Sequence, residues 1–397
     1  MARSKPVSTR VRVVNSSDYI IVGGGLQGGL IALALRHRQP AARVTMIDRG
    51  PRPGGNHTWS FHANDLPTEA EPFVRPLVSA EWPNYLVNFP GFARTVPSRY
   101  AAISSDRFAD VMEKSGCELR TGTEVVALGQ SSVRLADGTE LNAACVLDCR
   151  GPNAVEPTTA TGYQKFVGLE IETERHWPDA VPTIMDASVP QDDGFRFVYV
   201  LPFTSNRVLI EETHFADGTG LNKPLLRQRI GEYADARNVG RWRVLREEAG
   251  VLPMPWAGAG VRVPETGPLP VGYAGGWCHP ATGYSFPLAV RVALAIMGAR
   301  PSDARTAIRR LARRIVHRQR FARFLNRLLF TLVVPQQRWQ VFRRLYRAVP
   351  DATLNRFYAL DFGPLDAARM VVGWPPPVSL SRLIHRPEPT PCPLPST

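Results

Sequence analysis

A glycine-rich turn between an apolar strand and an apolar helix is the feature that most limits how this chain can fold. The run from Gly23 to Gly28 has the spacing G-x-G-x-x-G, and the residues at 19–22 and 30–35 on either side are apolar. Glycines at this spacing permit a tight turn and let the backbone approach a pyrophosphate, toward which the N–H groups of the following helix point. We predict a β-α-β unit that binds a dinucleotide through Gly23, Gly25 and Gly28. The alternative is a glycine turn with a structural role.

An acidic residue, Asp48, ends the next predicted strand, 20 residues past Gly28. An acid at this place typically binds a ribose 2′-hydroxyl and argues against a 2′-phosphate. The turn by itself does not distinguish NAD from FAD. Its position near the N-terminus and a second cofactor-like segment at 268–283 favour FAD, in a layout that resembles two-domain flavoprotein hydroxylases. The glycines that we expect to contact the flavin in that second segment are Gly275, Gly276 and Gly283.

Positive charge is concentrated near the C-terminus. The 397 residues carry a formal net charge of +13, and residues 301–350 contain 13 arginines and a single acid, Asp303. Apolar residues recur between these arginines at helical spacing, which predicts a basic amphipathic helix in this segment. Helices are expected to dominate over 303–358. Such helices suit an anionic membrane surface. The alternatives are a solvated helical hairpin packed on the main body and an arginine-aromatic surface for nucleic acid.

Composition excludes several classes of protein. With 44% hydrophobic and 21% charged residues, the chain is not disordered, collagenous or coiled-coil. Its five cysteines form no C-x-x-C pair, which argues against a metal site and a disulfide framework and fits a reducing, intracellular setting. Residues 1–17 have the character of a loose basic leader without the apolar stretch of a secretory signal, and no stretch is apolar enough to span a membrane.

Three further segments carry chemically useful side chains. They are GGNHTWSFH at 54–62, LIEETH at 209–214 and HPATGYS at 279–285. With the glycine turn and the stretches at 166–168 and 193–199, they resemble the bacterial flavin-dependent lycopene β-cyclases, in the same order along the chain. The resemblance covers about residues 18–295, and residues beyond about 300 do not match one by one.

The resemblance implies a reaction without net oxidation or reduction. An acid protonates the end-group double bond of linear lycopene, the next double bond attacks the cation to close a six-membered ring, and a ring proton is lost. Repetition at the other end converts lycopene through γ-carotene into β-carotene. Members of this family need FAD in its reduced form, with NAD(P)H as the reductant. The reduced flavin is expected either to stabilise the cation or to donate the proton.

Two neighbouring glutamates, Glu211 and Glu212, are the main candidates for acid–base chemistry. They lie on a predicted strand and therefore point to opposite faces, so only one is expected in the pocket. The resemblance favours Glu211 as the acid or base, and an apolar pocket raises the pKa of a carboxyl so that it keeps its proton. Glu212 is then expected to support it or to pair with an arginine. The alternative is a pair of surface glutamates on a hairpin.

The resemblance also marks His279 as a candidate for proton handling or cation stabilisation, the alternative being a histidine that caps its turn. His57 and Trp59 are expected to shape the substrate pocket or the flavin edge, or else to serve in packing. Aromatic rings can shield a carbocation with their faces. The candidates for that role, besides Trp59, are Phe61, Phe197 and Tyr199.

We predict an α/β fold with a Rossmann-like FAD-binding core, an inserted mostly β substrate-binding region and a C-terminal helical region. The expected boundaries are 18–65, 98–155 and 266–300 for the core, 66–97 and 156–265 for the substrate region, 301–360 for the basic helices and 375–397 for a loose tail. The expected elements include helices over 105–115, 221–239 and 287–298, a hairpin with strands at 195–201 and 207–213, and a turn-rich stretch at 50–97.

The expected partners are lycopene and other linear carotenoids, an anionic membrane surface and other carotenoid-pathway enzymes, without nucleic acid. The expected location is peripheral, at the cytoplasmic face of the inner membrane. The alternative enzyme is an FAD-dependent monooxygenase or oxidoreductase on a hydrophobic substrate, which would consume NAD(P)H and oxygen in proportion to product. A nucleic-acid-binding protein would leave Asp48 and the segments at 209–214 and 279–285 without a purpose.

Overall fold

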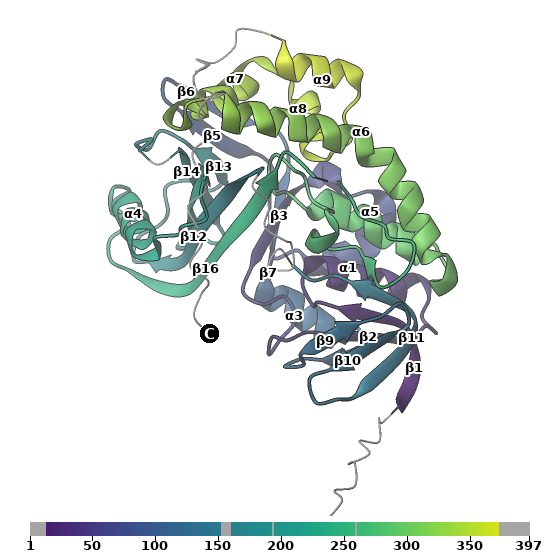
Figure 1. Ribbon diagram of the computed structural model, residues 1–397. Coiled ribbons are helices and arrows are strands. Elements are labelled where there is room, and N and C mark those ends of the chain that lie inside the picture. The colour runs from purple at the N-terminus through teal and green to yellow at the C-terminus, as the bar shows by residue number, and fades with distance from the viewer. Residues whose placement is uncertain (1–12, 152–159, 193, 259, 373–397) are drawn as a thin grey trace, which may run out of the picture.

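The computed structural model describes residues 13–151, 160–192, 194–258 and 260–372 (Figure 1). Within these residues, three β-sheets are followed by a C-terminal group of helices. The predicted α/β class is confirmed, with a Rossmann-like core, a mostly β region and a helical region. The predicted tail at 375–397 lies outside the described residues.

The first sheet carries the glycine turn. Its strand order is β8-β2-β1-β11-β10-β9, with β17 beside β11. The strands β8, β2, β1, β11 and β17 run parallel, whereas β10 and β9 are antiparallel. Their bounds are β1 (Val13–Val22), β2 (Val44–Ile47), β8 (Glu118–Arg120), β9 (Val125–Leu128), β10 (Ser132–Leu135), β11 (Glu140–Asp148) and β17 (Leu269–Pro270). The predicted leader is too long, because β1 already pairs with β11 from Val13.

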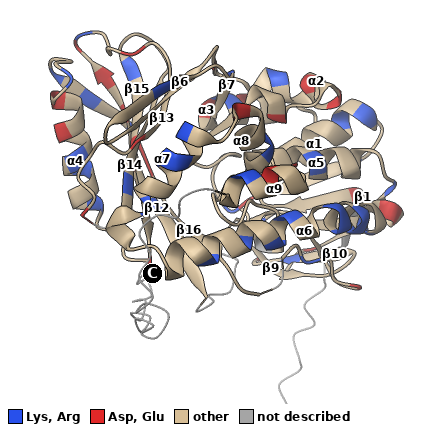
Figure 2. Ribbon diagram, turned by 90° about the horizontal axis from the view of Figure 1, so that it is seen from above, with Lys and Arg blue, Asp and Glu red and all other residues tan. Residues whose placement is uncertain are grey.

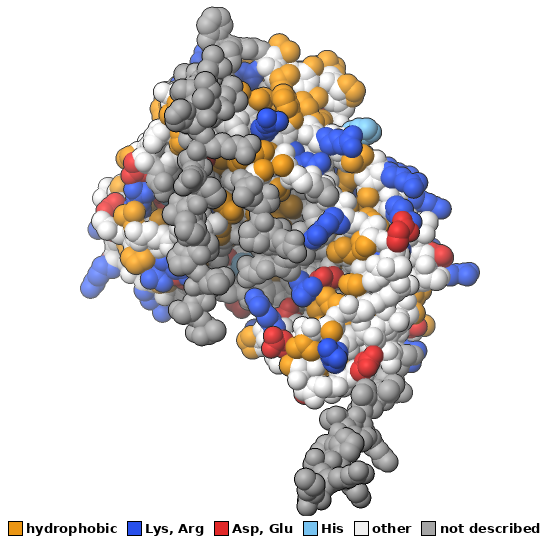
Figure 3. Space-filling view, viewed as in Figure 1, with side chains coloured by type: hydrophobic (Ala, Val, Ile, Leu, Met, Phe, Trp, Pro, Cys, Tyr) orange, Lys and Arg blue, Asp and Glu red, His pale blue; other side chains and the backbone are white. Residues whose placement is uncertain are grey.

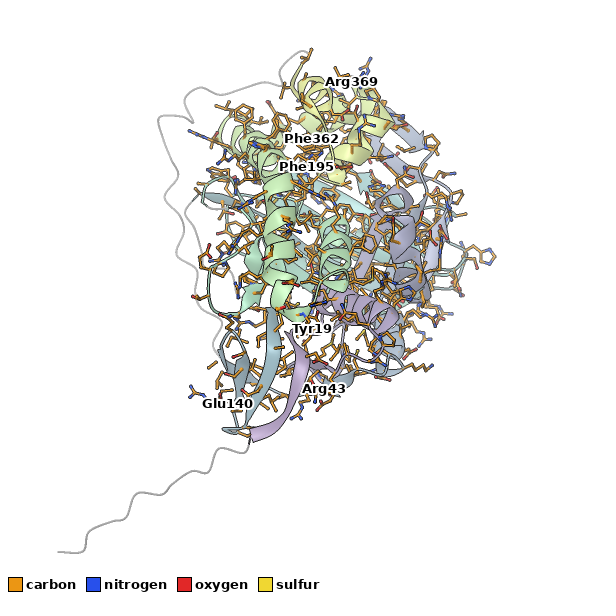
Figure 4. All side chains as sticks on the ribbon, turned by 90° about the vertical axis from the view of Figure 1, so that its right-hand side faces the viewer. Tyr19, Arg43, Glu140, Phe195, Phe362 and Arg369 are labelled. Carbon is orange, nitrogen blue, oxygen red and sulfur yellow. The ribbon has the colours of Figure 1, made fainter. Side chains whose placement is uncertain are left out.

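Alternate residues of β1 enter two different cores, as a sheet between two layers requires. Tyr19 and Ile21 share a core with α1 (Leu26–Arg38) and α5 (Phe286–Met297), and Ile20 and Val22 share another with β10 and β11. The hydroxyl of Tyr19, which Figure 4 labels, donates to the carbonyl of Ala299 at 3.1 Å. The sheet is thereby fixed to the chain just beyond α5.

The second sheet has the order β16-β12-β15-β14-β13-β5-β6. Neighbouring strands are antiparallel except for β13 and β5. Their bounds are β5 (Tyr85–Phe89), β6 (Phe92–Val96), β12 (Thr161–Thr173), β13 (Thr183–Asp186), β14 (Phe195–Pro202), β15 (Arg207–Ala216) and β16 (Trp242–Pro255). The predicted hairpin is confirmed as β14 and β15, but the long strand β16 was not predicted.

The two faces of the second sheet meet different neighbours. Helix α4 (Lys223–Asp235) covers the outer face through a core that includes Ile210 of β15 and Ile230 of the helix. On the other face, the ring of Phe195 stacks on Phe342 with centroids 4.4 Å apart. Figure 1 shows α4 on the far side of this sheet from β3 and β7. The inner face therefore looks toward the rest of the protein.

A small third sheet, with the order β3-β7-β4, lies between the two large sheets (Figure 1). It consists of β3 (Thr58–His62), β4 (Ala80–Trp82) and β7 (Tyr100–Ser104), and helices α2 (Glu71–Val74) and α3 (Ser105–Glu113) lie nearby in sequence. The stretch at 50–97, which was predicted to be turn-rich, contains strands as well as turns. Short strands with alternating burial, such as Tyr85–Phe89, occur there between the prolines.

In Figure 1, three of the C-terminal helices lie at the top, above the second sheet, and the longest one runs from there down past α5. The C-terminal helices are α6 (Ala304–Thr331), α7 (Trp339–Ala348), α8 (Asp351–Tyr358) and α9 (Pro364–Val371). Helix α6 contacts α5 and β16, and the buried amide of Asn326 donates to the carbonyl of Met254 at 2.5 Å. The predicted helices over 303–358 are confirmed, and α6 packs on the body along one side.

Candidate active site

The glycine turn has the geometry that an anion-binding helix start needs. Gly23 adopts a φ of +109°, and its N–H donates to the carbonyl of Ile47 at 2.8 Å. A Cβ on Gly28 would overlap the carbonyl oxygen of Gly23, whereas a Cβ on Gly25 would meet no atom within 4 Å. Gly25 is also the N-cap of α1, and no side chain caps the helix there. The first turn of α1 is thus open to a phosphate.

Asp48 follows β2 and stands beside the turn. One of its oxygens accepts from the N–H of Gly24 at 2.5 Å and the other from the N–H of Gly50 at 2.6 Å. The side chain keeps some accessible surface. Since a carboxylate oxygen can accept more than one hydrogen bond, Asp48 is still able to bind ribose hydroxyls while it fixes the turn.

The second glycine segment converges on the first. Strand β17 pairs with β11, and Val271 and Gly272 both donate their N–H groups to the carbonyl of Asp148. Added Cβ atoms on Gly23 and on Gly272 would each lie 2.8 Å from the carbonyl carbon of Cys149. The end of β11 is therefore pressed between the two glycine segments.

The later glycines shape the chain between β17 and α5. Gly276 and Gly283 have φ values of +80° and +68°, which favour glycine, and a Cβ on Gly275 would overlap the carbonyl of Pro270. Gln27 of α1 donates to the carbonyl of Ala289 of α5 at 3.2 Å. The predicted cofactor segments are adjacent in space, although about 245 residues separate them in sequence.

The inner face of the second sheet carries a row of four residues around Glu211. Glu211 of β15 is paired with Tyr199 of β14 and with Gly168 of β12, and Gly168 is paired with Glu248 of β16. Directly paired residues on neighbouring strands point to the same face. The row Tyr199–Glu211–Gly168–Glu248 therefore faces the third sheet, where Ser60 shares a 2.6 Å hydrogen bond with the hydroxyl of Tyr199.

The environment of Glu211 favours its protonated form. Burial, assisted by the charge of Glu248, raises the pKa of Glu211 to about 8, although a 2.5 Å hydrogen bond from the hydroxyl of Thr213 opposes the shift. The side chain still has some accessible surface. Glu211 is thus a carboxylic acid at neutral pH that remains within reach of a small reacting group.

Glu212 lies on the opposite face, as the strand geometry requires. It is fully buried and forms an ion pair with Arg196, while the imidazole of His214 lies 3.0 Å from one of its oxygens. Arg229 of α4 comes within 3.9 Å of the same oxygen. The predicted arginine partner of Glu212 is present, and the structure places this residue away from Glu211 rather than in a shared pocket.

His279 is held by backbone groups on both sides of its ring. Nδ1 accepts from the N–H of Ala281 at 3.1 Å, and Nε2 lies 3.0 Å from the carbonyl of Phe357. Burial lowers the pKa of His279 to about 3. Because both nitrogens already have partners and the ring stays neutral, this geometry favours the turn-capping alternative over proton handling.

The four predicted pocket residues come from two parts of the fold, with His57 just before β3, Trp59 at its start, and Phe197 and Tyr199 on β14. His57 is exposed, with its ring centroid 6.2 Å from that of Trp59, which in turn lies 5.0 Å from that of Phe108. Phe197 is buried and stacks on Phe195 at 5.0 Å. Of these residues, Tyr199 lies beside Glu211, whereas the rings of Phe197 and Trp59 are engaged with other rings.

A family of lycopene cyclase proteins matches residues 18–384. The chain belongs to the lycopene cyclase family. It is 40% identical over 366 residues to the lycopene beta-cyclase of Paracoccus sp., a match that covers 90% of this chain and 94% of the relative. It is also 40% identical over 371 residues to the lycopene beta-cyclase of Pantoea ananas, covering 92% and 97%.

Solved structures share the fold of this lycopene cyclase family member. A geranylgeranyl bacteriochlorophyll reductase-like protein from Thermoplasma acidophilum has a TM-score of 0.66 at 12% identity, over 90% of this chain and 98% of the other. A mutant of the halogenase PltM in complex with FAD has a TM-score of 0.62 at 15% identity, over 87% and 82%. The resemblance inferred from the sequence is confirmed, and the fold is one that flavoproteins use.

Sequence reasoning missed Glu248, the second carboxyl on the face of this cyclase family member that carries Glu211. Glu248 is buried, accepts from the N–H of Thr58 at 2.8 Å and pairs with Arg246 at 3.0 Å. The signal was a second Glu-Glu pair at 247–248, which resembles the pair at 211–212. It was missed because four of the six residues at 243–248 are charged, so that this part of β16 was not recognised as a strand.

A second buried acid also escaped the sequence analysis. Asp65 accepts from the hydroxyl of Tyr284 at 2.5 Å, and burial raises the pKa of Asp65 to about 7. Beside them, His62 is buried with no hydrogen-bond partner on Nδ1 among the described residues.

No helix in the described part of the chain is long and apolar enough to span a membrane.

Proposed function

We propose that this protein is a lycopene β-cyclase that converts the linear ends of lycopene into β-ionone rings by acid catalysis. The proposal is supported by membership of the lycopene cyclase family and by 40% identity to bacterial proteins named lycopene beta-cyclase. The single observation that carries the mechanism is Glu211, whose pKa is raised to about 8 on the inner face of the sheet. An alkene is a weak base, and a carboxyl that still holds its proton at neutral pH suits its protonation.

In the proposed mechanism the carboxyl of Glu211 gives its proton to the terminal double bond of the substrate. A tertiary cation forms, the next double bond attacks it to close the ring, and a ring proton leaves, so the molecular formula is unchanged. The hydroxyl of Thr213 orients one oxygen of Glu211 through its 2.5 Å hydrogen bond. We propose that the aromatic ring of Tyr199, which is paired with Glu211 on the neighbouring strand, stabilises the developing cation.

The residues of the glycine turn fit FAD. Gly25 leaves open space at an uncapped helix start for a phosphate, Asp48 is placed for a ribose, and the segment with Gly275, Gly276 and Gly283 lies on the other side of β11. Reduced FAD would supply an electron-rich ring that stabilises a developing positive charge. We propose NAD(P)H as the reductant that prepares this form, without consumption in proportion to product.

We propose that both ends of lycopene react, giving γ-carotene and then β-carotene, so that the enzyme is an intramolecular lyase of the isomerase class. The alternative of an FAD-dependent monooxygenase is not favoured, because the family and its named bacterial relatives are cyclases. A monooxygenase would in addition leave the protonated Glu211 without a role.

A location at an anionic membrane surface, on the cytoplasmic face of the inner membrane, is supported by the C-terminal helices. Figure 2 shows Lys and Arg along α6, and Figure 3 shows hydrophobic side chains gathered over α8 and α9 beside basic ones. Phe324, Leu365 and Val372 are 50%, 64% and 70% exposed. Arginines among exposed apolar side chains suit a lipid headgroup layer, from which a hydrocarbon substrate has to be taken. Contacts with other carotenoid-pathway enzymes remain a prediction.

The proposed function is tested by expression in bacteria that accumulate lycopene, followed by pigment analysis. We expect the wild-type protein to yield γ-carotene and β-carotene and Glu211→Gln to reduce cyclic product at least a hundredfold, within the range of general acid catalysis. The matched control is Glu247→Gln, a partly exposed glutamate that pairs with Arg227. A fully active Glu211→Gln variant, or a product of altered mass, would contradict the proposal.

A further inference from the structure

A glycine separates two carboxyl groups on the inner face of the second sheet. Gly168 of β12 pairs with Glu211 on one side and with Glu248 on the other, so the three residues lie side by side and point the same way. A Cβ on Gly168 would lie 3.0 Å from Cγ and 3.3 Å from Oε1 of Glu248. The side chain of Glu248 therefore leans over the glycine, toward Glu211.

Each of the two carboxyl groups accepts hydrogen bonds through one of its two oxygens. Glu211 accepts from Thr213 on Oε1, and Glu248 accepts from the N–H of Thr58 and from Arg246 on Oε2. Over residues 13–151, 160–192, 194–258 and 260–372, no hydrogen bond reaches Oε2 of Glu211 or Oε1 of Glu248. The two remaining oxygens are thus available to interact with each other across Gly168, or with a reacting group.

The two carboxyls differ in their access to positive charge. Arg246 contacts Oε2 of Glu248 at 3.0 Å and Oε2 of Glu170 at 3.0 Å, and it also donates to the hydroxyl of Thr58 at 2.6 Å. Burial raises the pKa of Glu248, and Arg246 opposes that rise in part. For Glu211, burial also raises the pKa, and the charge of Glu248 raises it further. A single negative charge in this pair therefore belongs on Glu248 and the proton on Glu211.

The other titratable groups near Glu211 come from β14, β7, β12 and the segment just before β3. Tyr199 of β14 and Tyr100 of β7 have pKa values raised by burial, so both stay neutral. Glu170 of β12 is paired with Arg246 and Arg207, and His57 precedes β3 and is exposed. Two side chains in the described part of the chain shift the pKa of Glu211, namely Glu248 and Thr213, and of these Glu248 carries the charge.

We propose that Glu248 is a positioning residue for the cyclisation: its carboxylate, held by Arg246, keeps the proton on Glu211 until an alkene accepts it. The inference rests on the proposed function. When the O–H bond of Glu211 breaks and the new C–H bond forms, two carboxylates face each other across Gly168. That repulsion favours return of the ring proton to Glu211, which restores the starting state while Glu248 stays ionised throughout.

The test is the pH dependence of cyclisation by the flavin-loaded, reduced enzyme, in wild type and in Glu248→Gln. Glutamine keeps an acceptor for Thr58 and removes the charge. The rate falls as pH rises through the pKa of Glu211, and we expect this alkaline limb to move to lower pH by about one unit in Glu248→Gln. The matched control, Glu247→Gln on the other face of β16, should leave the limb in place. A second variant, Glu248→Asp, keeps the negative charge but moves it farther from Glu211. Its alkaline limb should lie between those of wild type and Glu248→Gln.

A merely structural role would lower the rate of Glu248→Gln at every pH and leave the limb where it is, which would overturn the inference. The protonation of Glu211 is also read without substrate, from the infrared C=O band of a protonated carboxyl that is lost in Glu211→Gln. Its midpoint should fall by the same amount in Glu248→Gln. If the infrared midpoint shifts in this way but the protein makes no cyclic carotenoid, the inference about the carboxyl pair stands and only the proposed function is refuted.

Discussion

Glu211 and Glu212 are adjacent in sequence and have opposite surroundings. Glu211 looks across Gly168 at another carboxyl, whereas Glu212 is enclosed by Arg196 and His214. The first arrangement favours a neutral acid, whereas the second is a buried ion pair. The alternation of a strand is enough to give the two neighbours different chemistry.

The raised pKa of Glu211 predicts a pH-dependent cost to folding. The unfolded value is near 4.5 and the folded value about 8, so the contribution of this group to stability is complete below pH 4.5 and is lost as pH rises to 8. Discounted for partial accessibility, the loss is on the order of 3 kcal/mol. Thermal unfolding of Glu211→Gln should therefore match wild type near pH 4.5 and exceed it by several degrees near pH 8. A difference that is constant with pH would contradict this.

Glu212 predicts the opposite outcome. Removal of one member of a buried ion pair leaves the other charge uncompensated and costs about 3–5 kcal/mol. We therefore expect Glu212→Gln to lower the midpoint of urea unfolding strongly near neutral pH, while Glu211→Gln raises it. If both variants behaved alike, the assignment of the two faces would be wrong.

At the level of elements, the glycine turn separates the requirements of folding from those of cofactor binding. A Cβ on Gly28 overlaps the backbone of Gly23, whereas a Cβ on Gly25 enters open space with a φ of −80° that alanine tolerates. Gly25→Ala should fold with wild-type stability and bind FAD at least tenfold more weakly, because the methyl group occupies the space for a phosphate. Gly28→Ala should lose both the wild-type stability and the binding of FAD.

The measurements are flavin fluorescence titration and thermal unfolding of each apoprotein. Gly218→Ala serves as the matched control, since its added Cβ would also meet no atom within 4 Å and it lies far along the chain from the turn. Undiminished flavin binding in Gly25→Ala would show that the phosphates do not pass over this residue.

Elements with a strong local pattern were predictable, and elements defined by distant partners were not. The turn at 23–28 and the hairpin of β14 and β15 follow from spacing, alternation and apolar runs in consecutive residues. Strand β16 has charged residues over 243–248 that make sense only once Glu170, Glu172 and Thr58 of other elements are in place. Glu248 was missed for the same reason: its neighbours come from β12 and β3.

For the molecule as a whole, the arginines divide into two groups. Arg318 pairs with Asp361, and Arg309 with Glu265, whereas several others on α6 are exposed. The predicted amphipathic helices are thus partly a packing surface, as the alternative of a hairpin on the main body also expected. The exposed group is the part that remains available to a membrane.

The exposed arginines predict salt-sensitive binding to anionic vesicles. Changing Arg313, Arg314 and Arg320 together to Glu should weaken binding to phosphatidylserine-containing vesicles at least tenfold, since each basic residue near such a surface contributes about 1 kcal/mol. Cyclisation of lycopene in detergent micelles should be unaffected. The control exchanges Arg49, Arg134 and Arg241, which are also exposed. Sedimentation with vesicles measures the binding of both triple variants. An equal loss of binding in the two variants would show that net charge alone, and not the position of the arginines on α6, is responsible.

Arg338, at the start of α7, has a consequence for how the protein can be divided. It is fully buried, donates to the carbonyl of Phe215 at the end of β15, and pairs with Asp217 at 2.5 Å. The same guanidinium lies 4.5 Å from the ring of Phe330 of α6. The arginine-rich end is therefore attached to the strand that carries Glu211. A truncation that removes the C-terminal helices would have to end after α7, because a cut before Arg338 would take away a buried guanidinium that holds β15 and α6 together.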